Sequence, residues 1–203
     1  MTVGAAGELG GRCGCSGHAQ GWGGAVCRVA SPRPQGAAMP VTPTFPATAI
    51  TYADGRYRSV IGVHLILLRD DKVLLGLRAG TGWRDGHYHV PAGTLEAGET
   101  APAGAVREAA EELGLDLREE DLELVHTVHH WTGEDDPRLH LFFLVRRWSG
   151  EPVNAEPHKC AGLSWYPLAD LPAPMVNFTA VALKLFPQGV TFSCVGWPEL
   201  ASS

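Results

Sequence analysis

Three glutamates lie close together in one short segment of the chain, and their spacing could build a site for a cation. They are Glu108, Glu111 and Glu112. On a helix with about 100° of rotation per residue, they fall on the side opposite an apolar face, which would comprise Val106, Ala109, Ala110 and Leu113. Carboxylates at these spacings repel one another, whereas a hard divalent cation such as Mg²⁺ prefers oxygen ligands and also binds substrate phosphates. The segment therefore predicts a helix with one core face and one metal-binding face.

The residues around these glutamates decide between a metal site and a solvated surface. Taken alone, an acidic helix face is more often simply solvated. The surrounding pattern is G-x5-E-x7-R-E-U-x-E-E-x-G-U, where U is a bulky apolar residue, and it resembles the signature of the Nudix (MutT-like) hydrolases. Its fixed positions are Gly93, Glu99, Arg107, Glu108, Glu111, Glu112 and Gly114. Ala109 is small for the first U position, whereas Leu115 fits the second. A looser resemblance extends over about residues 59–172.

The resemblance implies a role for each acidic residue of the motif. Glu108 and Glu112 would bind the metal, with Glu111 as a further ligand. Gly93 lies where a strand turns into a loop, and because it lacks a Cβ its carbonyl can face the ion. Arg107 can pair with Glu99 and hold the loop against the helix. The catalytic set would be Glu111, Glu108 and Arg107. The base that deprotonates water varies in the family, and the candidates are Glu108, Glu111, His129, His130 and Glu156.

Arginines and aromatic residues outside the motif are candidates for contacting the substrate. Arg78 and Arg84 could meet phosphates, with a solvated surface charge as the alternative for each. Aromatic rings near a loop can stack on a base or belong to the core. The aromatic candidates are Trp83, Tyr88 and Trp131. Cys160 is expected to be a small buried residue, not a nucleophile.

The chemistry that the resemblance implies is hydrolysis of a nucleoside diphosphate linked to another moiety. The first expectation is a Nudix pyrophosphohydrolase that cuts a nucleoside or deoxynucleoside triphosphate, with or without an oxidised base, to monophosphate and pyrophosphate. The cofactor would be Mg²⁺, with Mn²⁺ as a substitute. Two alternatives remain: a non-catalytic Nudix-like ligand sensor, and an isomerase of the isopentenyl-diphosphate type.

The elements that must position these residues alternate between strands and helices. Period-2 patterns, β-branched residues and turn signals predict strands, and capping and stop signals predict helices. The expected strands are 59–69, 72–78, 88–90, 121–131, 139–148 and 163–168, and the expected helices are 100–113 and 179–186. Asp70 and Asp71 should form a hairpin turn, and Thr100 should cap the first helix. This order predicts an α/β (α+β) sandwich of the Nudix type, with a mixed sheet between helices.

Length, composition and net charge indicate how the chain is divided and which partners are excluded. The chain has 203 residues and a formal net charge of −6, which argues against a nucleic-acid polymer as partner. The first 38 residues hold 10 of the 25 glycines and 3 of the 5 cysteines, and we expect a disordered tail or a mis-assigned start that precedes Met39. Residues 39–203 would then form a single Nudix domain. The longest apolar run is too short for a membrane span. Few cysteines suggest a reducing cytoplasm, and a homodimer is left open.

Overall fold

Two sheets and two helices make up the fold of the computed structural model, which describes residues 58–131 and 137–197. The strands are β1 (Val60–Ile66), β2 (Leu68–Arg69), β3 (Lys72–Arg78), β4 (Tyr88–His89), β5 (Ala92–Thr94), β6 (Leu122–His130), β7 (Arg138–Val145), β8 (Cys160–Pro167) and β9 (Phe192–Val195). The helices are α1 (Ala101–Leu113) and α2 (Asn177–Leu185), with short 3-10 turns η1 (Glu119–Asp121) and η2 (Phe186–Gln188). The expectations for residues 1–38 and for a start at Met39 lie outside the described residues.

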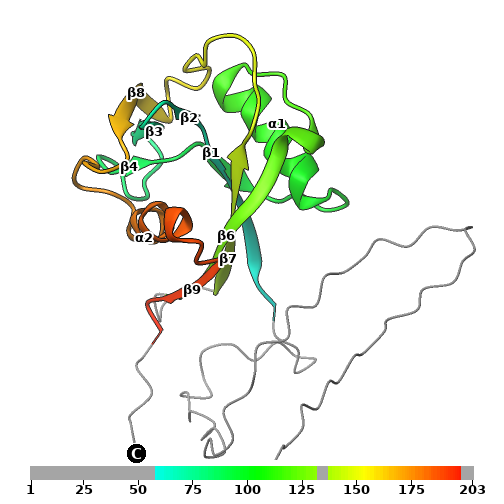
Figure 1. Cartoon of the computed structure of the whole chain (residues 1–203), viewed down its shortest axis with the longest axis vertical. Helices are drawn as coiled ribbons and strands as arrows, with labels where there is room; N and C mark the ends of the chain where they lie inside the picture. Colours follow the sequence, from blue (N-terminus) through cyan, green and yellow to red (C-terminus); the bar gives the residue numbers. More distant parts are fainter. Residues whose placement is uncertain (1–57, 132–136, 198–203) are drawn as a thin grey trace, which may run out of the picture. The chain divides into compact units, whose positions relative to one another are not determined.

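The larger sheet is mixed and lies between the two helices, as predicted. Its strand order is β5-β1-β7-β6-β9, in which β1–β7 and β6–β9 are parallel and the other pairs antiparallel. Alternate side chains of β7 serve two cores: Phe143 and Val145 pack on the α1 side, whereas Phe142 and Leu144 pack on the α2 side. Figure 1 shows α1 and α2 on either side of β6 and β7.

The expected long strand 59–69 is divided between the two sheets. Residues of β1 pair with β5 and β7, whereas the two residues of β2 pair with β3 across the turn at Asp70 and Asp71. The buried Leu67 lies between them. In the smaller sheet, β3 also pairs with β4 and β8. The chain therefore crosses from one sheet to the other near Leu67, and this crossing brings the end of β3 over the larger sheet. The short strands β5 and β9 were not predicted.

Helix α1 begins and ends where the sequence predicts, but its buried face is different. The Thr100 hydroxyl accepts a hydrogen bond from the amide of Ala103, and Gly114 adopts a left-handed conformation, with φ of 62°, at the carboxyl end. Ala109 and Leu113 are fully buried, whereas Ala110 is exposed, which corrects the predicted core face. The physical reason is that Glu108 turns inward. The small residues Gly104 and Ala105 lie on this same buried side.

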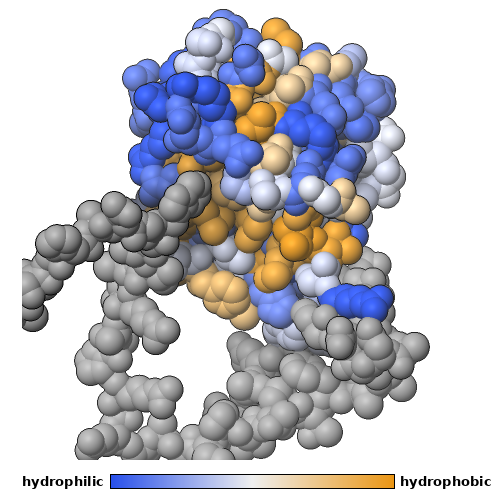
Figure 2. Space-filling model, turned by 90° about the vertical axis from the view of Figure 1, so that its right-hand side faces the viewer, coloured by the Kyte–Doolittle hydropathy of each residue, from blue (hydrophilic) through white to orange (hydrophobic). Residues whose placement is uncertain are grey.

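Some apolar surface remains exposed on the molecule. On the face drawn in Figure 2, hydrophobic residues gather in a band bordered by hydrophilic ones. In the described ranges, the large apolar side chains that are exposed are Trp83, Leu124, Val153, Val190 and Phe192. Single exposed apolar residues are usual in monomers. Neither described helix is long and apolar enough to cross a membrane.

Buried histidines between the larger sheet and α2 predict that acid destabilises the fold. Burial lowers the pKa of His89 and of His140 to about 3. The unfolded chain binds these protons below a pH of about 6.5, whereas the folded chain does so only near 3. Each histidine should therefore remove about 1.4 kcal/mol of stability per pH unit as the pH falls through this window.

Urea unfolding measured at about pH 7, 6 and 5 should show a shallower pH dependence for His140→Gln than for the wild type. The exposed His158, changed to Gln, is the matched control and should leave the slope unchanged. Equal slopes in all three proteins would contradict the assignment.

Candidate active site

The centre of the site is a close approach between β5 and α1. Gly93 pairs with Val63 of β1, and the carboxylate of Glu108 fills the space that a side chain at Gly93 would need. A Cβ at this position would overlap the Glu108 carboxylate. Because Gly93 has none, Glu108 lies against the backbone of β5 with only 8% of its surface exposed.

Arg107 ties the loop before α1 to the acidic residues of the helix. Its Nε and Nη2 donate to the two oxygens of Glu99, at 3.2 and 2.8 Å, and Nη2 also donates to the Thr94 carbonyl at 3.2 Å. Its Nη1 lies 2.8 Å from Oε1 of Glu108 and 3.1 Å from Oε2 of Glu111. These hydrogen bonds lower the pKa of the Glu99 carboxyl. One guanidinium thus holds three carboxylates of the motif in fixed positions.

Glu112 lies deeper than its neighbour Glu111. Its Oε2 accepts a hydrogen bond from the amide of Ala92 at 2.8 Å. Burial raises the pKa of Glu112 to about 7, and the charges of Glu108 and Glu156 add to the effect. Burial likewise raises the pKa of Glu108, against the opposing influence of Arg107. These buried carboxylates therefore carry an electrostatic cost that a bound cation would relieve.

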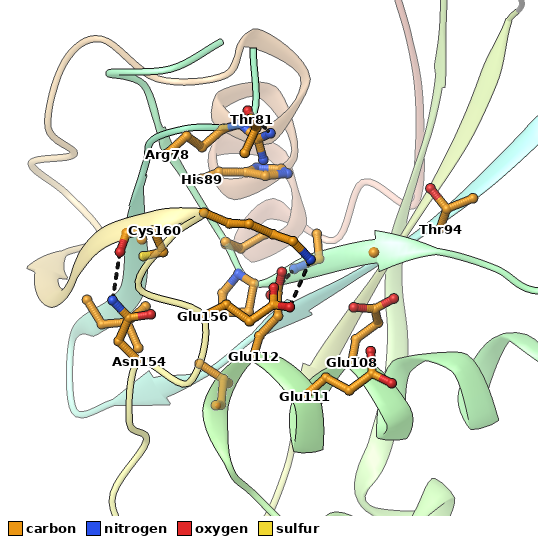
Figure 3. A pocket seen from close by; sticks show the side chains of 18 of the residues that line it. Arg78, Thr81, His89, Thr94, Glu108, Glu111, Glu112, Asn154, Glu156 and Cys160 are labelled. Atoms are coloured by element: carbon orange, nitrogen blue, oxygen red, sulfur yellow. Dashed lines mark hydrogen bonds and ion pairs between the residues drawn. The ribbon is translucent and has the colours of Figure 1, made fainter. Parts of the chain in front are cut away.

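A fourth carboxylate comes from the loop between β7 and β8. The amide of Val153 donates to the carbonyl of Leu113, and the amide of Ala155 donates to that of Glu112, so this loop is fastened to the end of α1. Farther along, the Asn154 side chain donates to the carbonyl of Cys160 at 2.7 Å. These bonds place Glu156 on the same cavity as Glu112, as Figure 3 shows.

The four glutamates line a cavity of about 430 Å³. Its floor is formed by β5 and α1, and its far wall by β3, β8 and the loop that carries Glu156. The polar and charged lining residues are Arg78, Thr81, His89, Thr94, Glu96, Arg107, Glu108, Glu111, Glu112, Asn154, Glu156 and Lys159. Cys160 also lines it, and burial raises the pKa of its thiol, which disfavours the nucleophilic thiolate.

A second cavity of about 530 Å³ adjoins the first. The two share Arg78, His89, Ala92, Gly93 and Thr94. Aromatic rings and imidazoles dominate the rest of the lining, namely His64, Trp83, His130, Trp131, His140 and Phe178. The His140 ring stacks on Phe178, with centroids 3.8 Å apart, and its Nδ1 lies 2.9 Å from Nε2 of His64. Burial lowers the pKa of His64 and His140, so these imidazoles are neutral near pH 7.

Arg78 stands at the boundary of the two cavities. Its Nε donates to the Trp83 carbonyl at 3.1 Å and its Nη2 to the Thr81 hydroxyl at 3.0 Å, while its guanidinium lies 4.8 Å from the Trp83 ring centroid. Asp85 fixes the same loop by accepting hydrogen bonds from Thr81 and Gly82. Arg84 lines the second cavity. Arg78 is thus a cation held in place between an acidic space and an aromatic one.

The structure brings some predicted residues to the cavities and leaves others away. Trp83 and Trp131 line the second cavity, whereas Tyr88 lines neither, which corrects its expected role. The reason is strand alternation: His89 points to the cavities and Tyr88 packs against Tyr166 in the core. His130 reaches the second cavity, while His129 packs on Trp197 and reaches neither.

Sequence reasoning missed several lining residues, notably His64, His140, Asn154, Lys159 and Phe178. His64 and His140 stand among apolar residues on two strands that are far apart in sequence. Their contact depends on the parallel pairing of β1 with β7, which cannot be predicted from the sequence pattern. A polar residue within an apolar strand was the one available signal for either histidine.

The chemistry of the donor set fits a hard divalent cation. Carboxylate oxygens and the backbone at Gly93 are the ligands that Mg²⁺ prefers. In the part of the chain that the structure describes, no three His, Cys, Asp or Glu side chains are already gathered as a metal cluster.

Comparison with known proteins identifies the family. The family model of the NUDIX domain matches residues 58–186. A Mycobacterium tuberculosis protein designated mutator protein MutT4 is 32% identical over 88 residues, which are 42% of this chain and 35% of that protein, so the match spans about a third of the relative's length.

Solved structures agree with the family model. The MutT NUDIX hydrolase of Burkholderia pseudomallei is 29% identical with a TM-score of 0.58, and the match covers 63% of this chain and 97% of that one. A MutT protein of Methanosarcina mazei Go1 shares the fold at 16% identity, with a TM-score of 0.56 and coverage of 65% and 95%. The family model spans more than half of the chain and includes Gly93 and the Glu108 that lies against it. The chain therefore belongs to the Nudix family, and it is similar to MutT-like proteins of that family.

Proposed function

We propose that the protein is a Mg²⁺-dependent pyrophosphohydrolase that converts a nucleoside or deoxynucleoside triphosphate to the monophosphate and pyrophosphate. The observation that carries this proposal is the pair of adjoining cavities, one lined by five glutamates and the other by aromatic rings, imidazoles and arginines. A nucleotide has the matching two halves, an anionic chain and an uncharged planar base. The similarity to a MutT NUDIX hydrolase supports a hydrolytic reaction.

The metal would be held by Glu108, Glu111, Glu112 and the carbonyl of Gly93. When bound, Mg²⁺ offsets the charge of the phosphates and lowers the pKa of a coordinated water, and Mn²⁺ could substitute for it. Nudix hydrolases generally need a divalent metal, and burial together with the charges of Glu108 and Glu156 raises the pKa of Glu112, an effect that a bound cation would oppose. The acidic cavity therefore needs cations before it can accept an anionic substrate.

The protein's own residues supply positioning and a proton acceptor. Arg107 keeps Glu99 and the loop fixed against α1, and Arg78 is placed to meet phosphate oxygens at the boundary of the cavities. In the reaction, the oxygen of water bonds to one phosphorus, the bond from that phosphorus to the bridging oxygen breaks, and the bridging oxygen leaves with the electron pair.

A carboxylate of the first cavity receives the proton released by the attacking water. Glu108, Glu111 and Glu156 all line this cavity and are the candidates for the base. Of the other candidates, His130 lines the adjoining cavity and His129 packs on Trp197.

The remaining assignments follow from this substrate class. The partner would be a small phosphorylated molecule, with neither a nucleic-acid polymer nor a membrane involved, and the protein would work in the cytoplasm. Trp83 and Trp131 are placed to stack on the base, because both line the second cavity. Residues 39–203 are proposed as a single Nudix domain.

Loss of a carboxylate from the first cavity should slow hydrolysis. Glu111→Gln and Glu156→Gln should each be tested for pyrophosphate release with Mg²⁺ over a panel of nucleotides, sugar nucleotides and dinucleotides. Loss of Glu111 should lower kcat/KM for the best substrate at least about a hundredfold, because it removes a metal ligand or the base. Of the two variants, the one that lacks the base should lose more in kcat than in KM. The matched control is Glu119→Gln, an exposed glutamate of η1. A wild type that releases no pyrophosphate from any member of the panel would reject the proposed reaction.

The second prediction concerns the approach of β5 to α1. Gly93→Ala places a Cβ where the Glu108 carboxylate lies, and that flexible side chain must move away. Activity should fall by about a hundredfold or more, since a metal ligand is displaced, while the melting temperature changes little. Gly162→Ala is the control, because a Cβ at Gly162 meets nothing within 4 Å. A fully active Gly93→Ala enzyme would show that Glu108 does not act from its observed position.

A further inference from the structure

Lys159 lies on the loop that supplies Glu156, and it is a cation inside the acidic cavity. Its Nζ is 2.8 Å from Oε1 of Glu156. Both side chains line the first cavity together with Glu108 and Glu112. Figure 3 shows Glu156 beside Glu112, above the end of α1. The motif contains no lysine, so this residue is outside the family signature.

The backbone around Lys159 is fastened on both sides of the cavity. The amides of Lys159 and Cys160 both donate to the carbonyl of Glu156, which forms a tight turn. The Lys159 carbonyl in turn accepts from the amide of Ala79, just after β3. On the other side, the amide of Ala155 is bonded to the carbonyl of Glu112 at the end of α1. The turn is therefore fixed, and movement is left to the Lys159 side chain.

The three basic side chains of this cavity differ in how firmly they are held. Arg107 donates to Glu99, Thr94, Glu108 and Glu111, and Arg78 is fixed by Trp83 and Thr81. In the described chain, the Lys159 ammonium has Glu156 as its acceptor, and 53% of its side chain is exposed. A lysine also has a flexible stem and three donors that can take a new partner. Lys159 is thus the cation of this lining that is able to change partners.

We propose that Lys159 is an exchangeable counterion of the active site. In the free protein it neutralises Glu156, and when a divalent cation enters the carboxylate cluster it leaves Glu156 and binds the phosphates of the substrate. This inference rests on the proposed function. The ammonium would be repelled by a cation bound among the neighbouring glutamates and attracted by the phosphates of a substrate. The contact with Glu156 raises the pKa of Lys159, so the ammonium stays charged throughout.

The test measures metal binding and catalysis separately. Lys159→Met removes the charge and keeps most of the stem, Lys159→Arg keeps a charge, and Lys184→Met removes an exposed lysine of α2 as the matched control. The affinity of each full-length protein for Mn²⁺ is measured without substrate, by electron paramagnetic resonance of free Mn²⁺. Steady-state kinetics with the best nucleoside triphosphate then give kcat and KM at saturating Mg²⁺.

We expect Lys159→Met to strengthen Mn²⁺ binding and to raise KM for the substrate. Lys159→Met should bind Mn²⁺ about two- to fivefold more tightly, because one competing surface charge is gone. Its KM should rise about tenfold, because a charged hydrogen bond to phosphate is lost, with less than about a threefold change in kcat. Lys159→Arg should lie close to the wild type in both measurements. In the Glu156→Gln background, adding Lys159→Met should no longer improve Mn²⁺ binding.

Several results would overturn the inference. Unchanged Mn²⁺ affinity in Lys159→Met would reduce the pair to a surface ion pair, and weaker Mn²⁺ binding would mean that Lys159 only holds Glu156 in place. An unchanged KM would show that Lys159 does not bind the phosphates of the substrate. Failure of the proposed function is distinguishable, because a wild type without turnover on any nucleotide can still bind Mn²⁺ and show the effect of Lys159→Met. Absence of Mn²⁺ binding in both proteins would reject both proposals.

Discussion

The need to keep four carboxylates in one partly buried space constrains this structure more than any other interaction. Like charges at such short range raise the free energy of the folded state, and burial adds a desolvation cost, which appears as the raised pKa of Glu108 and of Glu112. The protein lowers this cost with cations of its own. Arg107 holds Glu99, Glu108 and Glu111, while Lys159 holds Glu156. Negative charge remains on these carboxylates, and a bound divalent metal would offset it.

The fold can be understood as the means of placing those carboxylates. The crossing of the chain near Leu67 puts β1 and β3 in different sheets, so that Arg78 at the end of β3 faces the glutamates of α1 across a cavity. Gly93 lets α1 approach β5 closely, and the loop that follows β7 returns to the carboxyl end of the same helix. Each of these contacts joins segments that are distant in sequence, so that the site and the core depend on the same packing.

The two cavities have different linings, so each could bind a different part of one ligand. The first has carboxylates and fixed guanidinium groups, which suit metal ions and phosphates. The second offers aromatic rings, which suit a planar group, together with the guanidinium groups of Arg78, Arg84 and Arg138. Arg78 lines both, and its contacts with Thr81 and Trp83 hold it at their boundary.

Local chemistry was readable from the sequence because it depends on near neighbours. The cap at Thr100, the end of α1 at Gly114 and the mixed sheet between helices follow from residue type and period. The spacing of the motif put Glu108, Glu111 and Glu112 on one helix, and Arg107 within reach of Glu99. Glu156 was a candidate, yet nothing in its neighbourhood showed that its loop would be bonded to Glu112.

Only the tertiary structure decided which residues share a cavity. The inward turn of Glu108 left Ala110 exposed, because the space at Gly93 is defined by another element and not by the period of the helix. Strand alternation allowed either Tyr88 or its neighbour His89 to face the site, and packing against Tyr166 chose His89. The meeting of His64 with His140 required the register between β1 and β7. Such contacts depend on how distant segments pack, and a single sequence records each residue's chemistry but not the partner that folding brings to it.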